Sequence, residues 1–247
     1  MFFSIITATY NSSSTVKQAL QSLYNQSFQD YEHIIIDGFS TDNTLNIIEQ
    51  YKCNQVKVIS EPDNGMYDAL NKGIKLASGR VIGFLHADDA YSNPDVLRII
   101  HATFQENGTD AVYGDLKYVK KENPSKVLRH WKSNNYNPAM LKNGWMPPHP
   151  TFYVKKSIYD QYGVFDLAME ISSDYEIMMR FLGKFKISAS YIPDVLVTMK
   201  TGGASNSSLS NILKKSYEDY KAMKRYNIGG INTLIMKNIT KIKQFIQ

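Results

Sequence analysis

The first ninety residues alternate between short apolar runs and segments with helical spacing. The apolar runs are rich in β-branched residues, as buried strands are. These runs span residues 3–8, 31–36, 56–59 and 81–85. The segments between them place apolar residues on one helical face, and they span residues 14–24, 41–51 and 67–77. Such alternation predicts an α/β fold in which helices cover both faces of a mostly parallel sheet.

The pattern is less regular beyond Pro94. Residues 120–150 are rich in Asn, Pro and Lys and residues 201–208 in Gly and Ser, so both are expected to be mainly loop. Helices are predicted over residues 94–104, 155–161 and 172–182, and strands over residues 111–119, 151–154, 185–191 and 195–199. From Leu209 the spacing is helical to the end. We therefore expect one domain over residues 1–208 and a basic helical tail over residues 209–247.

Composition and charge narrow the class of protein. The 247 residues are 43% hydrophobic and 21% charged, which suits a folded domain. The net charge of +5 favours anionic partners such as nucleotides, phosphates or acidic lipids. A single cysteine, Cys53, excludes an intrachain disulfide and a cysteine-based zinc site. The first residues do not resemble a signal peptide and no apolar run reaches 18 residues, so we expect a cytoplasmic protein.

An adjacent pair of carboxylates follows the fourth predicted strand. Ligands of such sheets bind beyond the carboxyl ends of the strands, where Asp88 and Asp89 lie. Two neighbouring carboxylates repel each other without a cation, and their oxygens suit Mg²⁺ or Mn²⁺ bridging to a diphosphate. A helix cap beside a solvated carboxylate is the alternative interpretation of this pair.

Three further residues have side chains suited to catalysis or ligand binding. Asp37 follows the second strand and can accept hydrogen bonds from a nucleobase or ribose, or form a local turn. Asp174 lies near the start of a predicted helix, as a general base or simply as a residue favoured by the helix dipole. His149 lies between prolines in a rigid segment, where it contacts a phosphate, metal or acceptor, or is a surface residue.

The order and spacing of these motifs resemble the family 2 glycosyltransferases, which have the GT-A fold, a Rossmann-like nucleotide-binding mixed sheet flanked by helices. The resemblance covers about residues 3–205 and is nearest to enzymes that build bacterial surface polysaccharides. The matching segments are residues 7–11, 36–42, 64–65, 68–73, 78–79, 85–89, 162–166, 173–174 and 202–205. The sequence departs from the family at His86, which replaces the first Asp of the metal motif, and at Phe39, which lengthens the second motif by one residue.

The resemblance implies an inverting hexosyltransferase that uses a nucleotide-sugar donor, with UDP-sugars favoured, and a glycan or lipid-linked acceptor. It implies that Asp89 and Asp88 hold Mg²⁺ or Mn²⁺ and that Asp174 is the catalytic base. His149 and Lys200 are assigned to the acceptor or the diphosphate. The nucleotide-binding residues are expected to be Thr7, Thr9, Asn11, Asp37, Asn64, Gly65, Asp68 and Asp88.

The tail combines basic and apolar residues at helical spacing. Residues 214–243 contain eight Lys or Arg against Glu218 and Asp219. This pattern favours a helix on the inner face of an anionic membrane, which would suit a lipid-linked acceptor. The alternative is a helix that packs on the domain or in a homodimer interface.

Rival functions fit less well. A sugar nucleotidyltransferase usually has a Gly-rich phosphate loop after the first strand, and residues 10–14 contain no Gly. A non-catalytic sugar- or nucleotide-binding relative would be favoured by loss of the Asp pair or Asp174, and all three are present. Nucleic-acid binding is suggested by charge alone, without a recognised stacking motif, so we expect no nucleic-acid partner.

Overall fold

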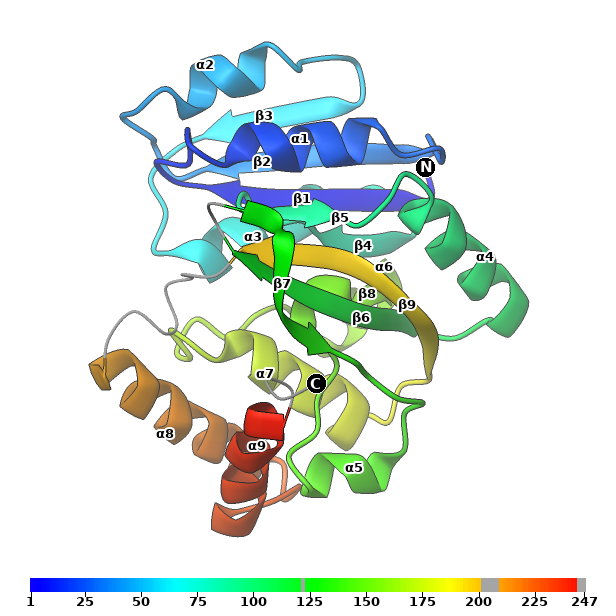
Figure 1. Cartoon of the computed structure of the whole chain (residues 1–247), viewed down its shortest axis with the longest axis vertical. Helices are drawn as coiled ribbons and strands as arrows, with labels where there is room; N and C mark the ends of the chain where they lie inside the picture. Colours follow the sequence, from blue (N-terminus) through cyan, green and yellow to red (C-terminus); the bar gives the residue numbers. More distant parts are fainter. Residues whose placement is uncertain (121–122, 201–208, 244–247) are drawn as a thin grey trace.

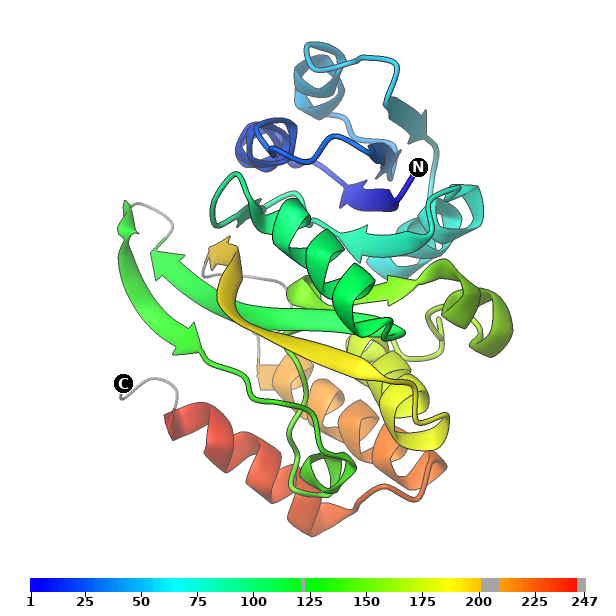
Figure 2. The same ribbon diagram turned by 90° about the vertical axis from the view of Figure 1, so that its right-hand side faces the viewer.

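A single mixed sheet organises the chain, with the predicted strand–helix alternation in its first half. The computed structural model describes residues 1–120, 123–200 and 209–243. The first four strands are parallel to one another and are β1 (Phe3–Thr9), β2 (Tyr31–Asp37), β3 (Val56–Ser60) and β4 (Val81–Phe84). The helices between them are α1 (Val16–Tyr24), α2 (Thr44–Glu49) and α3 (Met66–Leu76). Figure 2 shows α1 and α3 on opposite faces of the sheet.

The second half of the chain extends this sheet in mixed orientation. Its strands are β5 (Asp89–Tyr91), β6 (Ala111–Lys120), β7 (Asn123–Trp131), β8 (Tyr153–Lys155) and β9 (Ala189–Lys200). The order is β3-β2-β1-β4-β8-β6-β9-β5, with β7 paired to β6 (Figure 1). The antiparallel β8 joins β4 to β6, whereas β6 and β9 are parallel. The helical segments are α4 (Val96–Asn107), α5 (Pro138–Lys142), η1 (His149–Thr151), α6 (Lys156–Tyr162), α7 (Ser173–Met178) and η2 (Met179–Lys184).

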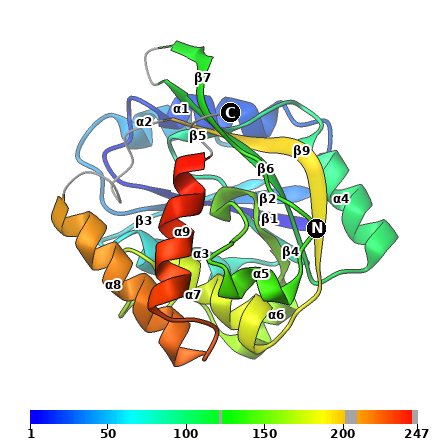
Figure 3. The same cartoon turned by 60° about the horizontal axis from the view of Figure 1, so that its bottom comes forward.

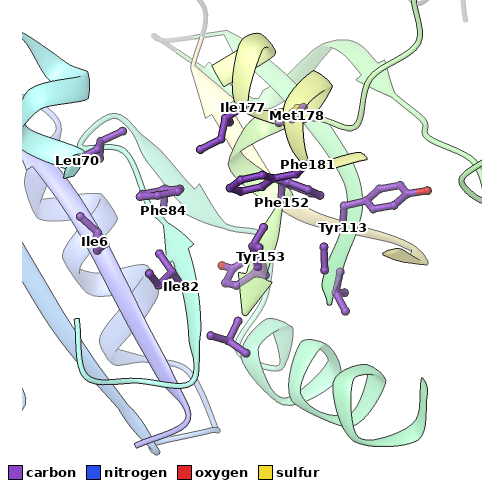
Figure 4. Packing of buried hydrophobic residues seen from close by; sticks show 14 of the residues in the cluster. Ile6, Leu70, Ile82, Phe84, Tyr113, Phe152, Tyr153, Ile177, Met178 and Phe181 are labelled. Atoms are coloured by element: carbon purple, nitrogen blue, oxygen red, sulfur yellow. The ribbon is translucent and has the colours of Figure 1, made fainter. Parts of the chain in front are cut away.

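The core is continuous across the join between the two halves of the sheet. Figure 4 shows Phe84 of β4 and the aromatic rings of Phe152 and Phe181 between the sheet and α7. The ring of Tyr153 crosses β4 at Gly83, where an added Cβ would lie 2.1 Å from a ring carbon. Glycine at this position therefore allows β4 and β8 to pack closely, which brings the end of β4 near α7.

Two predictions for the second half of the chain were wrong. Residues 120–150 were expected to be mainly loop but contain β7 and α5, because β7 is a largely polar hairpin strand without period-two apolar spacing. The two strands expected over residues 185–191 and 195–199 are one strand, β9, which begins at residue 189, so residues 185–188 precede it. Its register to β6 shifts between Gly114 and Asp115, which pair with Ile192 and Val195, so the break is a bulge within the strand.

The predicted helical tail forms two helices, α8 (Leu209–Arg225) and α9 (Ile231–Lys243). Both lie beside α7 on one face of the molecule (Figure 3). The expected glycine loop over residues 201–208 and the boundary after residue 208 lie outside the described residues. Within the described ranges, no helix has the length and apolar character needed to cross a membrane.

Candidate active site

Asp37 organises the carboxyl ends of β1 and β2. Thr9 Oγ1 donates to one of its carboxylate oxygens at 2.9 Å, and Ser60 Oγ donates to the other at 2.8 Å. Ser40 donates through both its backbone N–H, at 2.9 Å, and its hydroxyl, at 2.5 Å. Burial alone would raise the carboxyl pKa, but these four hydrogen bonds outweigh it and lower the pKa. Asp37 therefore remains a carboxylate that fixes the turn after β2.

The turn after β1 is tied to the same segment. The side-chain oxygen of Asn11 accepts hydrogen bonds from the backbone N–H groups of Thr41 at 2.9 Å and Asp42 at 3.3 Å. Asn11 itself has a φ of 47°, and Phe39 has a φ of 65°. Both turns are thus held in a defined shape with two left-handed backbone conformations, which are uncommon for residues other than glycine.

Replacing Phe39 with glycine is expected to stabilise the protein by about 0.5–1 kcal/mol. The left-handed conformation disfavours a bulky side chain, and the Phe39 ring is 62% exposed, so little packing is lost. Urea unfolding measures the change, with Phe39→Ala as the comparison, because alanine removes the ring but retains the Cβ. A Phe39→Gly protein less stable than Phe39→Ala would contradict the expectation.

The remaining predicted nucleotide residues occupy different settings. Asn64 and Gly65 precede α3, where Gly65 has a φ of 102° and Asn64 N–H donates to Asp68 Oδ2 at 3.0 Å. Asp68 also lies 3.8 Å from Lys72. Thr7 is fully buried and donates to the Leu85 carbonyl at 2.7 Å, so it joins β1 to the end of β4. Asn64 and Gly65 thus precede α3, and Asp68 lies in its first turn. Thr7 is a buried residue that links β1 to the residue after β4.

Asp89 is a buried carboxylate at the start of β5. It is 1% exposed, and neither carboxylate oxygen has a hydrogen-bond partner among the described residues. Burial raises its pKa, the negative charge of Asp88 raises it further, and Lys200 at the end of β9 opposes this shift. Asp88 is half-buried beside it. The chain therefore brings together Asp88, Asp89 and Lys200 but leaves both Asp89 oxygens buried without a hydrogen-bond partner among the described residues.

Asp174 is held in place at the start of α7. Tyr67 OH donates to Asp174 Oδ1 at 3.2 Å, and His149 Nδ1 lies 3.4 Å from Asp174 Oδ2. Burial raises the Asp174 pKa, but His149 when protonated, the charges of Lys215 and Lys237 and the Tyr175 N–H together outweigh it, so the pKa lies below its usual value. Asp174 is therefore ionised at neutral pH.

His149 and His86 connect Asp174 to the end of β4. Their rings are 5.7 Å apart, and His86 interacts electrostatically with both Asp88 and Asp174. Burial lowers the pKa of His149 to about 4, against the opposing effect of Asp174. His149 is therefore neutral at neutral pH, and its position beside Asp174 suits an N–H donor to the carboxylate.

A cavity of about 80 Å³ lies beside Asp174. Its walls come from α3, β4, η1, α6 and α7 and are mainly aromatic and aliphatic, including Phe84, Phe152 and Phe165. His86, His149, Asp174 and Lys215 provide its polar part. The cavity therefore places an ionised carboxylate beside apolar walls.

Two functional candidates on α8 were missed by the sequence interpretation. Lys215 lines the cavity, and Glu218 accepts hydrogen bonds from the backbone just before α7. Both were treated as part of a basic amphipathic pattern. The sequence did contain a signal for this contact, because the acidic Glu218 and Asp219 interrupt an otherwise basic segment. Two acidic residues in such a helix indicate that it pairs with another part of the protein.

Comparison with known proteins identifies the family. The model of glycosyl transferase family 2 matches residues 4–164. The chain belongs to this family. A PGL/p-HBAD biosynthesis glycosyltransferase from Mycobacterium bovis is 28% identical over 209 residues, covering 83% of this chain and 79% of the relative. Chondroitin synthase from Pasteurella multocida is 28% identical over 188 residues, covering 74% of this chain and 19% of that enzyme.

Solved structures share the fold of this family 2 glycosyltransferase. A fragment of S. aureus TarS in complex with UDP-GlcNAc has a TM-score of 0.73 at 22% identity, covering 92% of this chain and 66% of that fragment. The mannosyltransferase PcManGT from Pyrobaculum calidifontis, in complex with GDP-Man and Mn²⁺, has a TM-score of 0.64 at 16% identity, covering 99% of this chain and 69% of that protein. The predicted family, GT-A fold and transferase class are confirmed.

Proposed function

We propose that this protein is an inverting glycosyltransferase that moves a sugar from a nucleoside diphosphate donor, with UDP-sugars favoured, to a hydroxyl of a glycan or lipid-linked acceptor in polysaccharide biosynthesis. One observation carries the proposal: an ionised carboxylate, Asp174, lies at a cavity and interacts through His86 with the Asp88–Asp89 region. The donor preference is supported by TarS, a structural neighbour in complex with UDP-GlcNAc.

The arrangement separates the donor and acceptor sides of the site. We assign the turns held by Asp37 and Asn11, with Thr9, to the nucleotide, because they lie at the carboxyl ends of β1 and β2. Asp68, at the start of α3, is assigned to the same ligand. His149 and Lys200 are placed toward the acceptor and the diphosphate.

The reaction needs a single protein base. Asp174 accepts the proton of the acceptor hydroxyl as that oxygen bonds to the anomeric carbon. The bond from the anomeric carbon to the diphosphate oxygen breaks on the opposite face, and the nucleoside diphosphate leaves with the electron pair. The configuration inverts through a state with oxocarbenium character. His149 keeps the carboxylate oriented, since it contacts Asp174 Oδ2 and is itself neutral.

The residues present fit a divalent cation. Asp89 is buried, its oxygens have no hydrogen-bond partner among the described residues, and its charge is otherwise opposed mainly by Lys200. Asp88 and Asp89 would hold the ion through carboxylate oxygens, since the described residues contain no group of three or more His, Cys, Asp or Glu placed to hold a metal. A bound Mg²⁺ or Mn²⁺ would neutralise the charge that develops on the leaving diphosphate.

A thermal-shift screen of nucleotide sugars tests the donor assignment. UDP-glucose, UDP-galactose, UDP-N-acetylglucosamine and GDP-mannose are compared with and without Mn²⁺. Stabilisation by one donor, larger in the presence of Mn²⁺, is the expected result, because a ligand that binds the folded state raises the melting temperature. Absence of any stabilisation would instead favour a non-catalytic relative.

We propose further that α9 contacts an anionic membrane, which would bring a lipid-linked acceptor to the site. One face of α9 packs on the protein through Thr233 and Lys237, and its opposite face exposes Ile231, Ile235 and Ile239 at four-residue spacing. The basic residues of α8 and α9 supply the charge that complements acidic lipids.

Replacing Ile235 with glutamate should reduce binding to phosphatidylglycerol-containing vesicles by about tenfold or more, since burial of one isoleucine contributes about 1.5–3 kcal/mol. Flotation measures this, and Gln105→Glu on α4 is the control for the added negative charge. Ile235 is 50% exposed, so the fold should be retained. Equal flotation of the two variants would exclude membrane contact through α9, and a wild-type protein that is dimeric in solution and does not float would favour a second copy as the partner.

A further inference from the structure

The segment that presents Asp174 is held in part by α8. The backbone N–H groups of Ile171 and Ser172 both donate to Glu218 Oε2, each at 2.9 Å. Ser172 is the N-cap residue of α7 but makes no capping hydrogen bond with its side chain. Its hydroxyl instead donates to the Lys215 carbonyl at 3.3 Å. The start of α7 is therefore capped from another helix, two residues before Asp174.

The same region contains a buried ion pair that links three helices. Lys237 of α9 lies 2.8 Å from Asp219 of α8, and the two side chains are 2% and 4% exposed. Lys237 Nζ also lies over the ring of Tyr175 on α7. A buried ion pair adds little net stability compared with apolar packing, but it can fix the register of the elements that it joins. This pair fixes α8, and hence Glu218, relative to α7.

We propose that Glu218 is a positioning residue for Asp174, and that α8 and α9 thereby complete the active site. The proposal rests on the proposed function, in which Asp174 is the base. Glu218 is 5% exposed and uses a single oxygen to accept both N–H groups, which sets where α7 begins. A shift of the first turn of α7 would move the Asp174 carboxylate away from the acceptor hydroxyl. Displacements of about 1 Å at a reacting group can reduce a rate by about 10²-fold.

The test measures nucleoside diphosphate release with water as acceptor, using whichever of the four nucleotide sugars named above stabilises the protein. Glu218→Ala should lower kcat by about 10–100-fold with an unchanged donor Kd, because the donor residues lie on other elements. Glu218→Gln should recover most of kcat, since the amide oxygen can accept the same two hydrogen bonds. Glu170→Ala is the control, because it also removes a carboxylate that contacts α8. Glu170 is exposed and pairs with Lys214 of that helix.

A double variant distinguishes positioning of the base from general stabilisation. If Glu218 acts through Asp174, adding Glu218→Ala to Asp174→Asn should reduce kcat no further. A further loss equal to that of Glu218→Ala alone would overturn the proposal, as would a near-normal kcat for Glu218→Ala. A normal kcat for Asp174→Asn would overturn the base assignment itself, which is a separate failure. If Glu218→Ala does not fold, Glu218→Asp withdraws the oxygen by one methylene and should show the same kcat loss with an unchanged Kd.

Discussion

Replacing Asp174 with asparagine is expected to lower turnover by about 10²–10⁴-fold while donor affinity stays unchanged. Asparagine keeps the size of the side chain and can still contact Tyr67 and His149, but it cannot remove the proton from the acceptor hydroxyl. The measurement is glycosyl transfer or donor hydrolysis beside a calorimetric donor Kd. Asp160→Asn is the matched control, since Asp160 pairs with Lys156 on the exposed side of α6. Near-normal transfer by Asp174→Asn would exclude it as the base.

The pH profile of the wild-type enzyme gives an independent check on Asp174. Its folded-state pKa is lowered, so the carboxylate is present at all pH values above about 4, the ordinary pKa of an aspartate. We therefore expect kcat to stay level from pH 8 down to pH 5 and to decline only as pH falls through the lowered pKa. The same sign applies to stability, because the ionised form is favoured by folding above the unfolded pKa and this contribution is lost at acid pH. A decline centred between pH 6 and 7 would point to another group.

The strand ends of the first half could be predicted from sequence because local pattern determines them. Buried strands leave clear apolar runs, and the carboxyl ends of parallel strands meet at one edge, so Asp37 and Asp88 could be placed there without coordinates. The hydrogen bonds that these side chains make within the protein could not be predicted. Asp37 accepts four hydrogen bonds, two from Ser40 in the turn after β2 and one each from Thr9 and Ser60 at neighbouring strand ends. Phe39, exposed and with a positive φ, lies within the turn that Asp37 and Ser40 close.

The surroundings of Asp174 were harder to predict because the residues there are distant in sequence. Tyr67, His149, Asp174 and Lys215 come from four separate elements, and they meet only because β8 joins the two halves of the sheet. The antiparallel β8 has three residues, too few to show a period in the sequence. The resemblance to a family located Asp174, but Lys215 and Glu218 lie on α8, beyond the span of that resemblance, so only packing could reveal them.

Replacing Asp89 with asparagine is expected to stabilise the metal-free protein and weaken metal-dependent donor binding. A buried polar group without partners costs on the order of 1–3 kcal/mol and an ionised one costs more, and Asp89 is 1% exposed with no hydrogen-bond partner for its oxygens among the described residues. Asparagine, which has the same shape, avoids the additional cost of the charge, and each kcal/mol corresponds to roughly 2–4 °C in melting temperature. The same change removes a negatively charged oxygen ligand, so the Mn²⁺-dependent part of donor affinity should fall by at least about 10–100-fold.

The pH dependence of the melting temperature should also distinguish the wild-type protein from Asp89→Asn. Because burial and Asp88 raise the folded-state pKa of Asp89, its contribution to stability is present below the unfolded pKa of about 4 and is lost as pH rises toward the folded value. Metal-free wild-type protein should therefore lose stability between pH 5 and pH 8 relative to Asp89→Asn, and Mn²⁺ with the nucleotide should restore it. Asp95→Asn is the control, because Asp95 is exposed and pairs with Arg98. A metal-free Asp89→Asn protein that is less stable than wild type, with unchanged Mn²⁺ dependence, would show that Asp89 is a structural carboxylate and would move the metal assignment to Asp88 alone.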